Sequence, residues 1–388
     1  MSLIRSERAA AGILLGAAVL GLVVANTPFG PVVQSVKDAQ LGPAALHLQL
    51  SVGAWISDGL LAVFFFIVAI ELRHELTVGE LSSWRKALHP AIAALFGVAV
   101  PACIFLVFAA GSGFQNGWPI PTATDIAFAL GVLAVFGRGL PHRLRVFLLA
   151  LAVLDDLIAI LIIAVFFTRN PNLVDLAVAA VCVVAFWLLS RMLRGRLRGP
   201  VAVLMVLVGI LTWMLVHDSG VHATIAGVAL GLVMSRPPAR ATAHALEPWS
   251  NGVVLPVFAF SAALVAVPAV PIGGLSPAFW GILVALPVGK LIGITLGGWI
   301  GGRIGSRSSG QPTGMLDTLV VAALGGIGFT VSLLMNELAF AHSDVVRDEG
   351  VLAVLLGSSV SIVAGGIAVA LLAKRYRRLH PRHERSAA

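Results

Sequence analysis

Charge is scarce in this sequence. Asp, Glu, Lys and Arg together make up 11% of its 388 residues, whereas hydrophobic residues make up 59%, and the mean hydropathy is +0.98. A soluble globular domain carries about 25% charged residues. The composition therefore excludes an ordinary water-soluble domain and indicates that lipid surrounds most of the chain.

Cysteine is also scarce. Cys103 and Cys182 both lie in long apolar runs, where a thiol behaves as a small hydrophobe. Two such residues exclude a disulfide framework and a thiolate metal site, so we expect no cofactor. The formal charge of +8 does not indicate nucleic-acid binding, because the basic residues lie in short loops between apolar segments and form no basic stripe.

The apolar runs have the length of membrane-spanning helices. Crossing a bilayer core of about 30 Å takes about 20 apolar residues, and lipid leaves helices as the means of satisfying the backbone. We predict an all-α polytopic membrane protein, one transporter domain over residues 1–388, with twelve transmembrane helices. The predicted segments are 9–26, 58–76, 87–109, 121–137, 144–167, 172–190, 200–216, 221–235, 250–268, 278–300, 314–336 and 350–373.

Basic residues define the predicted topology. The N-terminus, the tail and alternate loops hold 22 Lys and Arg residues, against three on the other side, namely Lys37, Arg169 and Arg347. Cytoplasmic loops carry such an excess, so both termini are predicted to be cytoplasmic in a bacterial inner membrane. Counting the run after Arg8 as a first span, and not as a cleaved signal peptide, makes this pattern consistent.

A short stretch between the first two segments has the period of a strand. Leu46, Leu48, Leu50 and Val52 alternate with polar residues, as in a half-exposed strand. We predict a small extracytoplasmic β-hairpin that pairs with a second copy of the chain to form a homodimer, because an unpaired strand is a template for pairing. The alternative is a loop lying on the lipid headgroups.

Two of the segments are predicted to be broken. Pro121 to Asp125 precede a run of 11 residues in segment four, and Gly325 to Gly328 interrupt segment eleven. Broken helices release backbone groups that only protein or a water-filled cavity can satisfy. Close helix packing is the alternative reading of the glycines. Such packing is the expected role of the pairs Gly12/Gly16, Gly227/Gly231 and Gly293/Gly297.

Four charges lie deep in the predicted membrane. Asp155 and Asp156 are near the middle of segment five, Asp125 lies at the break of segment four, and Lys290 lies about half way through segment ten. Each deep charge costs about 2.5 to 3.5 kcal/mol on insertion scales. Lys290 could act as a buried strut for one aspartate. Two carboxylates then remain to bind protons or a cation.

Carboxylates, threonine hydroxyls and freed carbonyls are hard oxygen ligands, which suit a small hard cation. Burial and mutual repulsion favour the protonated form of at least one carboxylate, so a proton and a cation compete for the same oxygens. This competition predicts exchange of one for the other.

Three other functions are less well supported. A proton-coupled symporter of a small organic anion needs a fixed positive pocket, and only Lys290 is available. An intramembrane aspartyl protease needs two carboxylates on different helices, whereas Asp155 and Asp156 are adjacent and no GxGD surrounds them. A channel would show a ring of repeated acids. We therefore expect a transporter and not an enzyme.

The stretches around these residues closely resemble the NhaA family of sodium/proton antiporters. They are PTATDIAFALGVLAVFG, FLLALAVLDDLIAI, SGVHATIAG, LPVFAF, GKLIGI and GGIGFTVS. The resemblance implies Asp156 as the principal cation ligand, Asp155 sharing the site and pairing with Lys290, and Thr124 and Asp125 where broken segments four and eleven cross. It also implies that residues 87–167 and 278–373 form an inverted repeat. The function that it implies is electrogenic exchange of Na⁺ or Li⁺ for more than one H⁺, in pH and sodium homeostasis.

The sequence departs from the family's pattern at a few positions, and these departures bear on the pH response. Glu71, His74 and Glu75 resemble the family's acidic cytoplasmic mouth, but His74 stands where the family usually has Arg. Ala243 stands where a Glu is expected, and the family's FANAG-like stretch reads FSAAL at 260–264. Because histidine changes charge near neutral pH, His74 is a candidate sensor. The alternative is a solvated histidine that pairs weakly with either glutamate.

Overall fold

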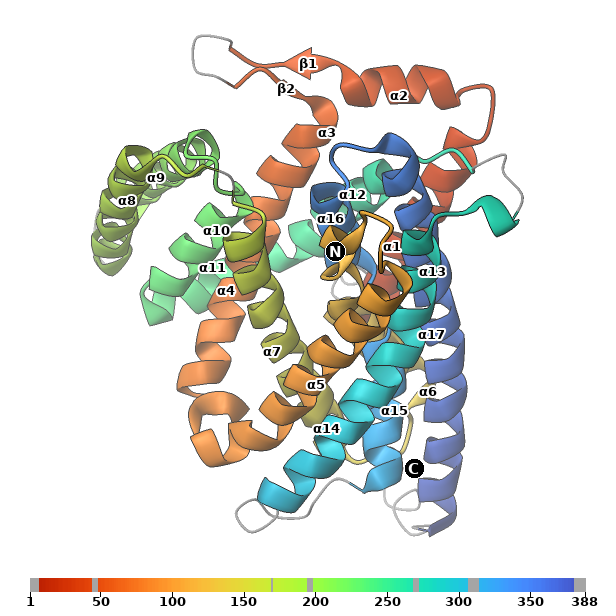
Figure 1. The fold of residues 1–388 in the computed structure, drawn as a ribbon. Coiled ribbons are helices and arrows are strands. Elements are labelled where there is room, and N and C mark those ends of the chain that lie inside the picture. The colour runs from red at the N-terminus through yellow and green to blue at the C-terminus, as the bar shows by residue number, and fades with distance from the viewer. Residues whose placement is uncertain are drawn as a thin grey trace. The chain divides into compact units, whose positions relative to one another are not determined.

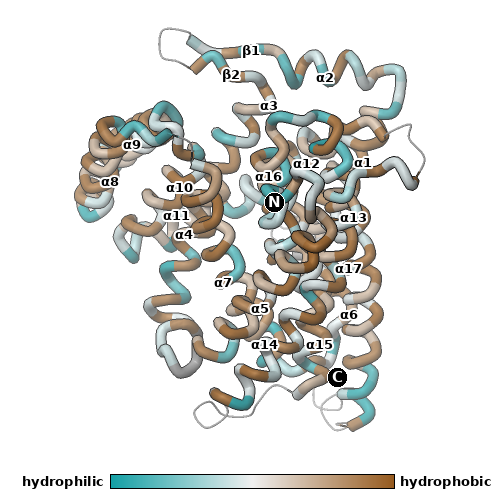
Figure 2. Tube along the Cα trace, viewed as in Figure 1, coloured by the Kyte–Doolittle hydropathy of each residue, from teal (hydrophilic) through white to brown (hydrophobic). Residues whose placement is uncertain are grey.

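The computed structural model describes residues 7–43, 48–168, 170–193, 198–267, 272–305 and 314–379. Nearly all of them are helical, and two short strands form one antiparallel sheet (Figure 1). Hydrophobic residues run along most of the helices, while hydrophilic residues are frequent in α2 and the hairpin (Figure 2). Helices predominate because a helix satisfies its own backbone hydrogen bonds in lipid.

The described residues contain eight helices that are long and apolar enough to cross a membrane, or ten if each of two bent helix pairs is one span. This confirms a multi-pass helical protein. Predicted segments eight and nine correspond to α10 (Thr224–Val233) and α12 (Leu255–Ala262), which are shorter than these spans. The number of twelve spans therefore stays a prediction.

Contacts divide the chain into two compact units. The first unit comprises residues 13–79 and 160–266, and the second comprises 80–159 and the chain from 267 onward, with residues 7–12 of α1. Elements of the first unit are α1 (Glu7–Ala25, from Ile13), α2 (Gly30–Asp38), β1 (Gln40–Leu41), β2 (Leu50–Ser51), α3 (Val52–Ala54), a π-helical turn (Trp55–Leu60), α4 (Leu61–Thr77), α8 (Leu173–Met192), α9 (Arg198–Asp218), α10, α11 (Arg236–Trp249), a second π-helical turn (Ser250–Val254) and α12.

The hairpin of the first unit pairs Gln40 with Ser51 and Leu41 with Leu50. A small two-stranded hairpin is thus confirmed, and its extracytoplasmic location stays a prediction. Leu46 lies outside the described residues. The strand prediction was wrong for Val52, which begins α3. The reason is local, because the Ser51 hydroxyl accepts a hydrogen bond from the Ala54 N–H at 3.0 Å and caps a helix there.

Glycines bring α10 and α4 into close contact in the first unit. A β-carbon at Gly227 would stand 2.0 Å from the Ala62 carbonyl oxygen, and one at Gly231 would stand 2.4 Å from that of Phe66. Only glycine permits this approach, so the packing role of this pair is confirmed. The same prediction was wrong for Gly12 and Gly16, because no described atom comes within 4 Å of either added carbon.

The second unit holds the remaining helices and all four deep charges. Its elements are three 3-10 turns (Glu80–Ser82, Gln115–Gly117 and Ile120–Thr122), α5 (Trp84–Phe108), α6 (Ile126–Phe136), α7 (His142–Phe166, up to Ala159), a 3-10 turn (Ile272–Gly274), α13 (Pro277–Val284), a π-helical turn (Ala285–Gly289), α14 (Lys290–Gly305), α15 (Met315–Gly325), α16 (Phe329–Ala339) and α17 (Asp344–Leu379).

Helix α14 lies directly against α5 (Figure 1). A β-carbon at Gly293 would stand 2.3 Å from the Phe96 carbonyl oxygen, and one at Gly297 would stand 2.7 Å from that of Ile92. Residues four apart lie on one face of a helix. The packing role predicted for these two glycines is confirmed, and this contact fixes where Lys290 lies at the start of α14.

Both segments predicted to be broken are interrupted. Segment four has a 3-10 turn at Ile120–Thr122, and Ala123 and Asp125 have extended backbones before α6 begins. In segment eleven, α15 and α16 are bent by 48°. The Asp125 N–H donates to the Ile327 carbonyl at 2.6 Å. The two interruptions thus satisfy part of each other's backbone.

Candidate functional site

Three polar side chains meet in the interior of the second unit. Lys290 Nζ lies 2.5 Å from Asp155 Oδ2, and the Thr124 hydroxyl lies 2.7 Å from the same oxygen. All three residues are buried, with Lys290 0% and Asp155 1% exposed. Three separate elements supply them: the extended stretch before α6, the middle of α7 and the start of α14. The structure thus places the predicted Asp155–Lys290 pair in direct contact.

The Thr124 hydroxyl has a choice of acceptors. Besides Asp155, it lies 2.8 Å from the carbonyl oxygen of Gly325, in the last turn of α15. A hydroxyl has one hydrogen to donate and two lone pairs. Thr124 can therefore donate to Asp155 or to Gly325 and still offer oxygen to a cation. The carbonyl of Gly325 belongs to the helix end that the break releases.

Asp125 lies between the starts of two helices. Its Oδ1 accepts from the Phe128 N–H at 3.2 Å and caps α6. Its Oδ2 accepts from the Thr330 N–H at 3.2 Å and from the Thr330 hydroxyl at 2.8 Å, in the first turn of α16. Helix N-termini carry partial positive charge, so one carboxylate stabilises both. The sequence interpretation overlooked Thr330, although it lies in the GGIGFTVS stretch.

Asp156 follows Asp155 on α7 and is also buried. Consecutive residues of a helix point about 100° apart, so the two carboxylates face different sides of α7. Among the described residues, no group of three or more His, Cys, Asp or Glu side chains is arranged to hold a metal ion. A cation bound here would take hydroxyl and carbonyl oxygens beside carboxylate oxygens.

The candidate pH-response residues belong to the first unit. Glu71, His74 and Glu75 occupy the last two turns of α4. The carboxylates of Glu75 and of Glu247, which belongs to α11, lie near enough to Glu71 to repel its charge. The sequence interpretation did not assign Glu247 to this group.

Packing explains why a small residue stands at position 243. Ala243 is buried in the same hydrophobic cluster as Ile70 of α4. A glutamate side chain there would need space that this cluster fills. Helix α11 carries its acidic side chain at Glu247 instead, and that carboxylate lies 3.8 Å from the imidazole of His244.

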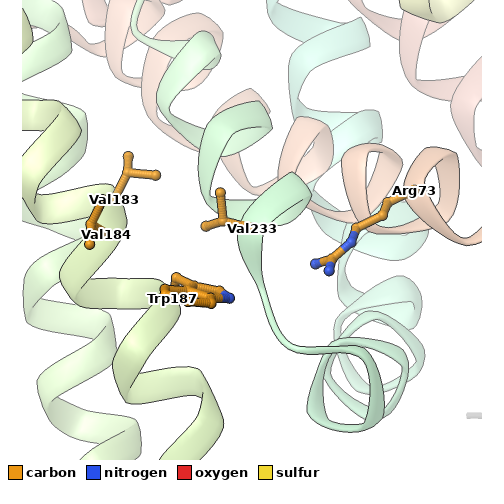
Figure 3. Close-up of a pocket in the computed structure, with 5 residues that line it drawn as sticks. All are labelled: Arg73, Val183, Val184, Trp187 and Val233. Carbon is orange, nitrogen blue, oxygen red and sulfur yellow. The ribbon is translucent and has the colours of Figure 1, made fainter.

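A separate pocket of about 200 Å³ lies in the first unit (Figure 3). Val183, Val184 and Trp187 of α8 line it together with Val233 of α10 and Arg73 of α4. The Arg73 guanidinium donates to the Met234 carbonyl. None of the predicted transport residues lines this pocket, and its lining is mainly apolar. It therefore offers little to a small cation.

A multi-pass helical protein whose buried ion pair adjoins two interrupted helices has the features of an ion-coupled membrane transporter. Residues 1–369 match the family model described as Na⁺/H⁺ antiporter 1. The chain belongs to this family.

Curated relatives agree with this assignment, and a solved structure has a similar fold. The chain is 60% identical over 381 residues to Na(+)/H(+) antiporter NhaA 2 of Clavibacter michiganensis subsp. michiganensis, covering 97% of this chain and 93% of that protein. It is 47% identical over 366 residues to Na(+)/H(+) antiporter NhaA of Tropheryma whipplei, covering 94% and 93%. The fold is similar to that of the sodium proton antiporter MjNhaP1 from Methanocaldococcus jannaschii, with a TM-score of 0.56, 17% identity and coverage of 94% and 92%.

Proposed function

We propose that this protein is a secondary antiporter that exchanges Na⁺ or Li⁺ for H⁺ across the bacterial inner membrane. The observation that carries the proposal is the buried contact of Lys290 and Thr124 with Asp155, next to the interruptions of segments four and eleven. Family membership and relatives named as Na⁺/H⁺ antiporters support the same function.

Each polar residue has a distinct proposed role. Asp156 is the principal cation ligand and Asp155 shares the site. Lys290 balances the charge of Asp155 until a proton or a cation takes its place, and Thr124 adds a hydroxyl oxygen. Because protons and cations compete for the same carboxylates, loading one releases the other. If only the proton-bound and cation-bound forms can move the site from one side of the membrane to the other, the result is exchange.

The same proposal covers stoichiometry and architecture. Two carboxylates that titrate for each bound Na⁺ would make exchange electrogenic, with more than one proton per sodium. Residues 87–167 and 278–373 form the transport core as an inverted repeat, in which segments four and eleven cross, and the remaining segments form the interface. An offset of seven segments reverses orientation, as an inverted repeat requires. We further propose twelve spans, cytoplasmic termini and a homodimer paired through an extracytoplasmic hairpin.

The test is exchange by the purified protein in proteoliposomes. A Na⁺ or Li⁺ pulse should cause the parent protein to move protons in exchange. This proton release is measured at pH values from 6 to 9. Asp156→Asn should abolish this release, because an amide neither titrates nor offers full charge to the ion. Asp344→Asn is the matched control, since that side chain is 82% exposed at the start of α17.

Either of two results would contradict the proposal. Full exchange by Asp156→Asn would remove the residue from the site. Proton uptake coupled to an organic anion, without any response to Na⁺ or Li⁺, would favour the symporter instead.

A further inference from the structure

We infer that Ile294 is a specificity-determining residue, which closes one side of the cation site and limits the size of the ion accepted. The inference rests on the proposed function. Ile294 is 0% exposed and lies four residues after Lys290 on α14, so both side chains lie on the same helix face. An apolar side chain therefore stands beside the charged one.

Two glycines form the slot that holds this side chain. A β-carbon at Gly97 of α5 would stand 2.8 Å from Ile294 Cγ1, and one at Gly325 of α15 would stand 2.4 Å from Ile294 Cδ1. At either position an added methyl group would require the side chain of Ile294 to shift. The side chain of Ile294 thus fills the space between α5 and α15 that the two missing side chains provide.

Both glycines also border the polar cluster. The β-carbon position at Gly97 lies 3.9 Å from Asp155 Oδ1, and that at Gly325 lies 3.9 Å from the Thr124 hydroxyl oxygen. Asp155 Oδ1 accepts no hydrogen bond from the described residues. It is therefore the oxygen of this carboxylate that remains for a cation, and Gly97 lies between it and Ile294.

The consequence for selectivity follows from packing. A close-packed apolar wall offers no oxygen ligand and leaves no space for extra water. Selection between hard cations depends on cavity size and on the number of ligands. Shortening Ile294 opens space beside Gly97 and Gly325, the two glycines that border Asp155 Oδ1 and Thr124. That space favours a larger or more hydrated ion. Discrimination against K⁺ should weaken.

The first experiment compares Li⁺, Na⁺ and K⁺ in the proteoliposome exchange assay for Ile294→Val and Ile294→Ala. The ratio of apparent affinities for Na⁺ and K⁺ should fall by about tenfold in Ile294→Ala and by less in Ile294→Val. Ile292→Val is the matched control, because Ile292 is on the same helix but is 49% exposed. Its ratio should equal that of the parent.

The second experiment tests the slot itself. Gly325→Ala should weaken exchange, because its methyl group meets Ile294 Cδ1 and displaces that side chain. Valine lacks Cδ1, so Gly325→Ala combined with Ile294→Val should recover exchange. Gly97→Ala meets Cγ1, which valine keeps. Ile294→Val should therefore fail to rescue Gly97→Ala, whereas Ile294→Ala should rescue it.

An unchanged ion ratio in Ile294→Val and Ile294→Ala, with normal exchange by the parent, would overturn the inference and leave the proposed function intact. If Ile294→Ala does not fold, the ratio in Ile294→Val decides alone. Absence of cation-driven proton release in the parent would instead refute the proposed function.

Discussion

At the residue scale, Lys290 and Asp155 form an ion pair from which solvent is fully excluded. Removing one partner of such a pair leaves an uncompensated buried charge, which costs about 3 to 5 kcal/mol. The pair is therefore a structural contact whatever its part in transport, and the two roles must be separated by substitution.

We predict that Lys290→Ala lowers thermal stability and changes the apparent cation affinity, because it removes both a partner and a local positive field. Lys290→Arg keeps the charge but does not deprotonate readily. Thermal unfolding in detergent and exchange in proteoliposomes measure the two effects. Electrogenic exchange retained by Lys290→Arg would mean that the lysine is a strut and that the aspartates carry the protons.

The second prediction at this scale concerns His74. A protonated imidazole near Glu71 and Glu75 on α4 would add positive charge at acidic pH and repel incoming cations, whereas a neutral one would leave the acidic group attractive. Arginine cannot switch in this way. Hence His74→Arg and His74→Ala should shift the pH of half-maximal exchange, measured from pH 6 to 9. If both variants keep the parent's value, His74 is a solvated histidine and the buried aspartates set the pH response.

At the scale of elements, the contact between α5 and α14 depends on backbone atoms that touch. Gly293 and Gly297 allow carbonyl oxygens of α5 to lie where a side chain would otherwise begin. Backbone cannot move aside as the end of a long side chain can, so this contact tolerates no added carbon. It holds α14, which carries Lys290 and Ile294, against α5.

We predict that Gly293→Ala separates the two helices, with loss of thermal stability of about 1 to 3 kcal/mol, typical of overpacking, and with loss of exchange. The matched control on the same helix is Gly302→Ala, where the nearest atom, His89 Nε2, lies 3.9 Å from the added carbon. Its melting temperature should stay within error of the parent's. Equal melting temperatures for both variants would show that the contact is loose in solution.

Polar contacts also join helix ends in the second unit. Arg143 at the start of α7 lies 3.1 Å from Asp317 of α15, and the Tyr376 hydroxyl of α17 lies 3.0 Å from the same carboxylate. Three helices distant in sequence are thereby joined at one place. Neither hydropathy nor helical period predicts this contact.

At the scale of the whole molecule, the hairpin is the element proposed to link two copies. Its strands are only two residues long, and a lone two-stranded hairpin has marginal stability in water. Pairing with a second hairpin would extend the sheet and satisfy its edge groups. The hairpin would then serve assembly, while the ion site lies within each chain.

We predict that replacing residues 40–51 by a Gly-Ser linker yields monomers that still exchange Na⁺ for H⁺. Mass measurement of the detergent-solubilised protein by light scattering gives the oligomeric state. Val32→Ser is the control, since this exposed residue of α2 lies outside the hairpin. Dimers that persist without the hairpin would place the interface elsewhere.

The sequence alone determined what depends on local pattern. Apolar runs long enough to cross a bilayer indicated the spans. Asp155, Asp156 and Lys290 were recognised as functional candidates because charge inside such a run is costly. Pro121 and the glycines of segment eleven marked the two interruptions, and the NhaA-like stretches indicated the family. The pairing of Asp155 with Lys290 came from the resemblance, since spacing cannot join residues 135 positions apart.

Only the tertiary structure decided which groups meet. Thr124 and Gly325 are 201 positions apart, Asp125 turned out to cap two helices, and Ile294 looked like one apolar residue among many. Gly293 and Gly12 stand in similar surroundings in the sequence. Among the described residues, an added carbon at Gly293 would meet a neighbouring helix, whereas one at Gly12 would meet nothing within 4 Å. The physical reason is that hydropathy and helical period measure one segment against lipid or water. Contacts between segments depend instead on how helix surfaces fit together, and the sequence of one segment does not contain that fit.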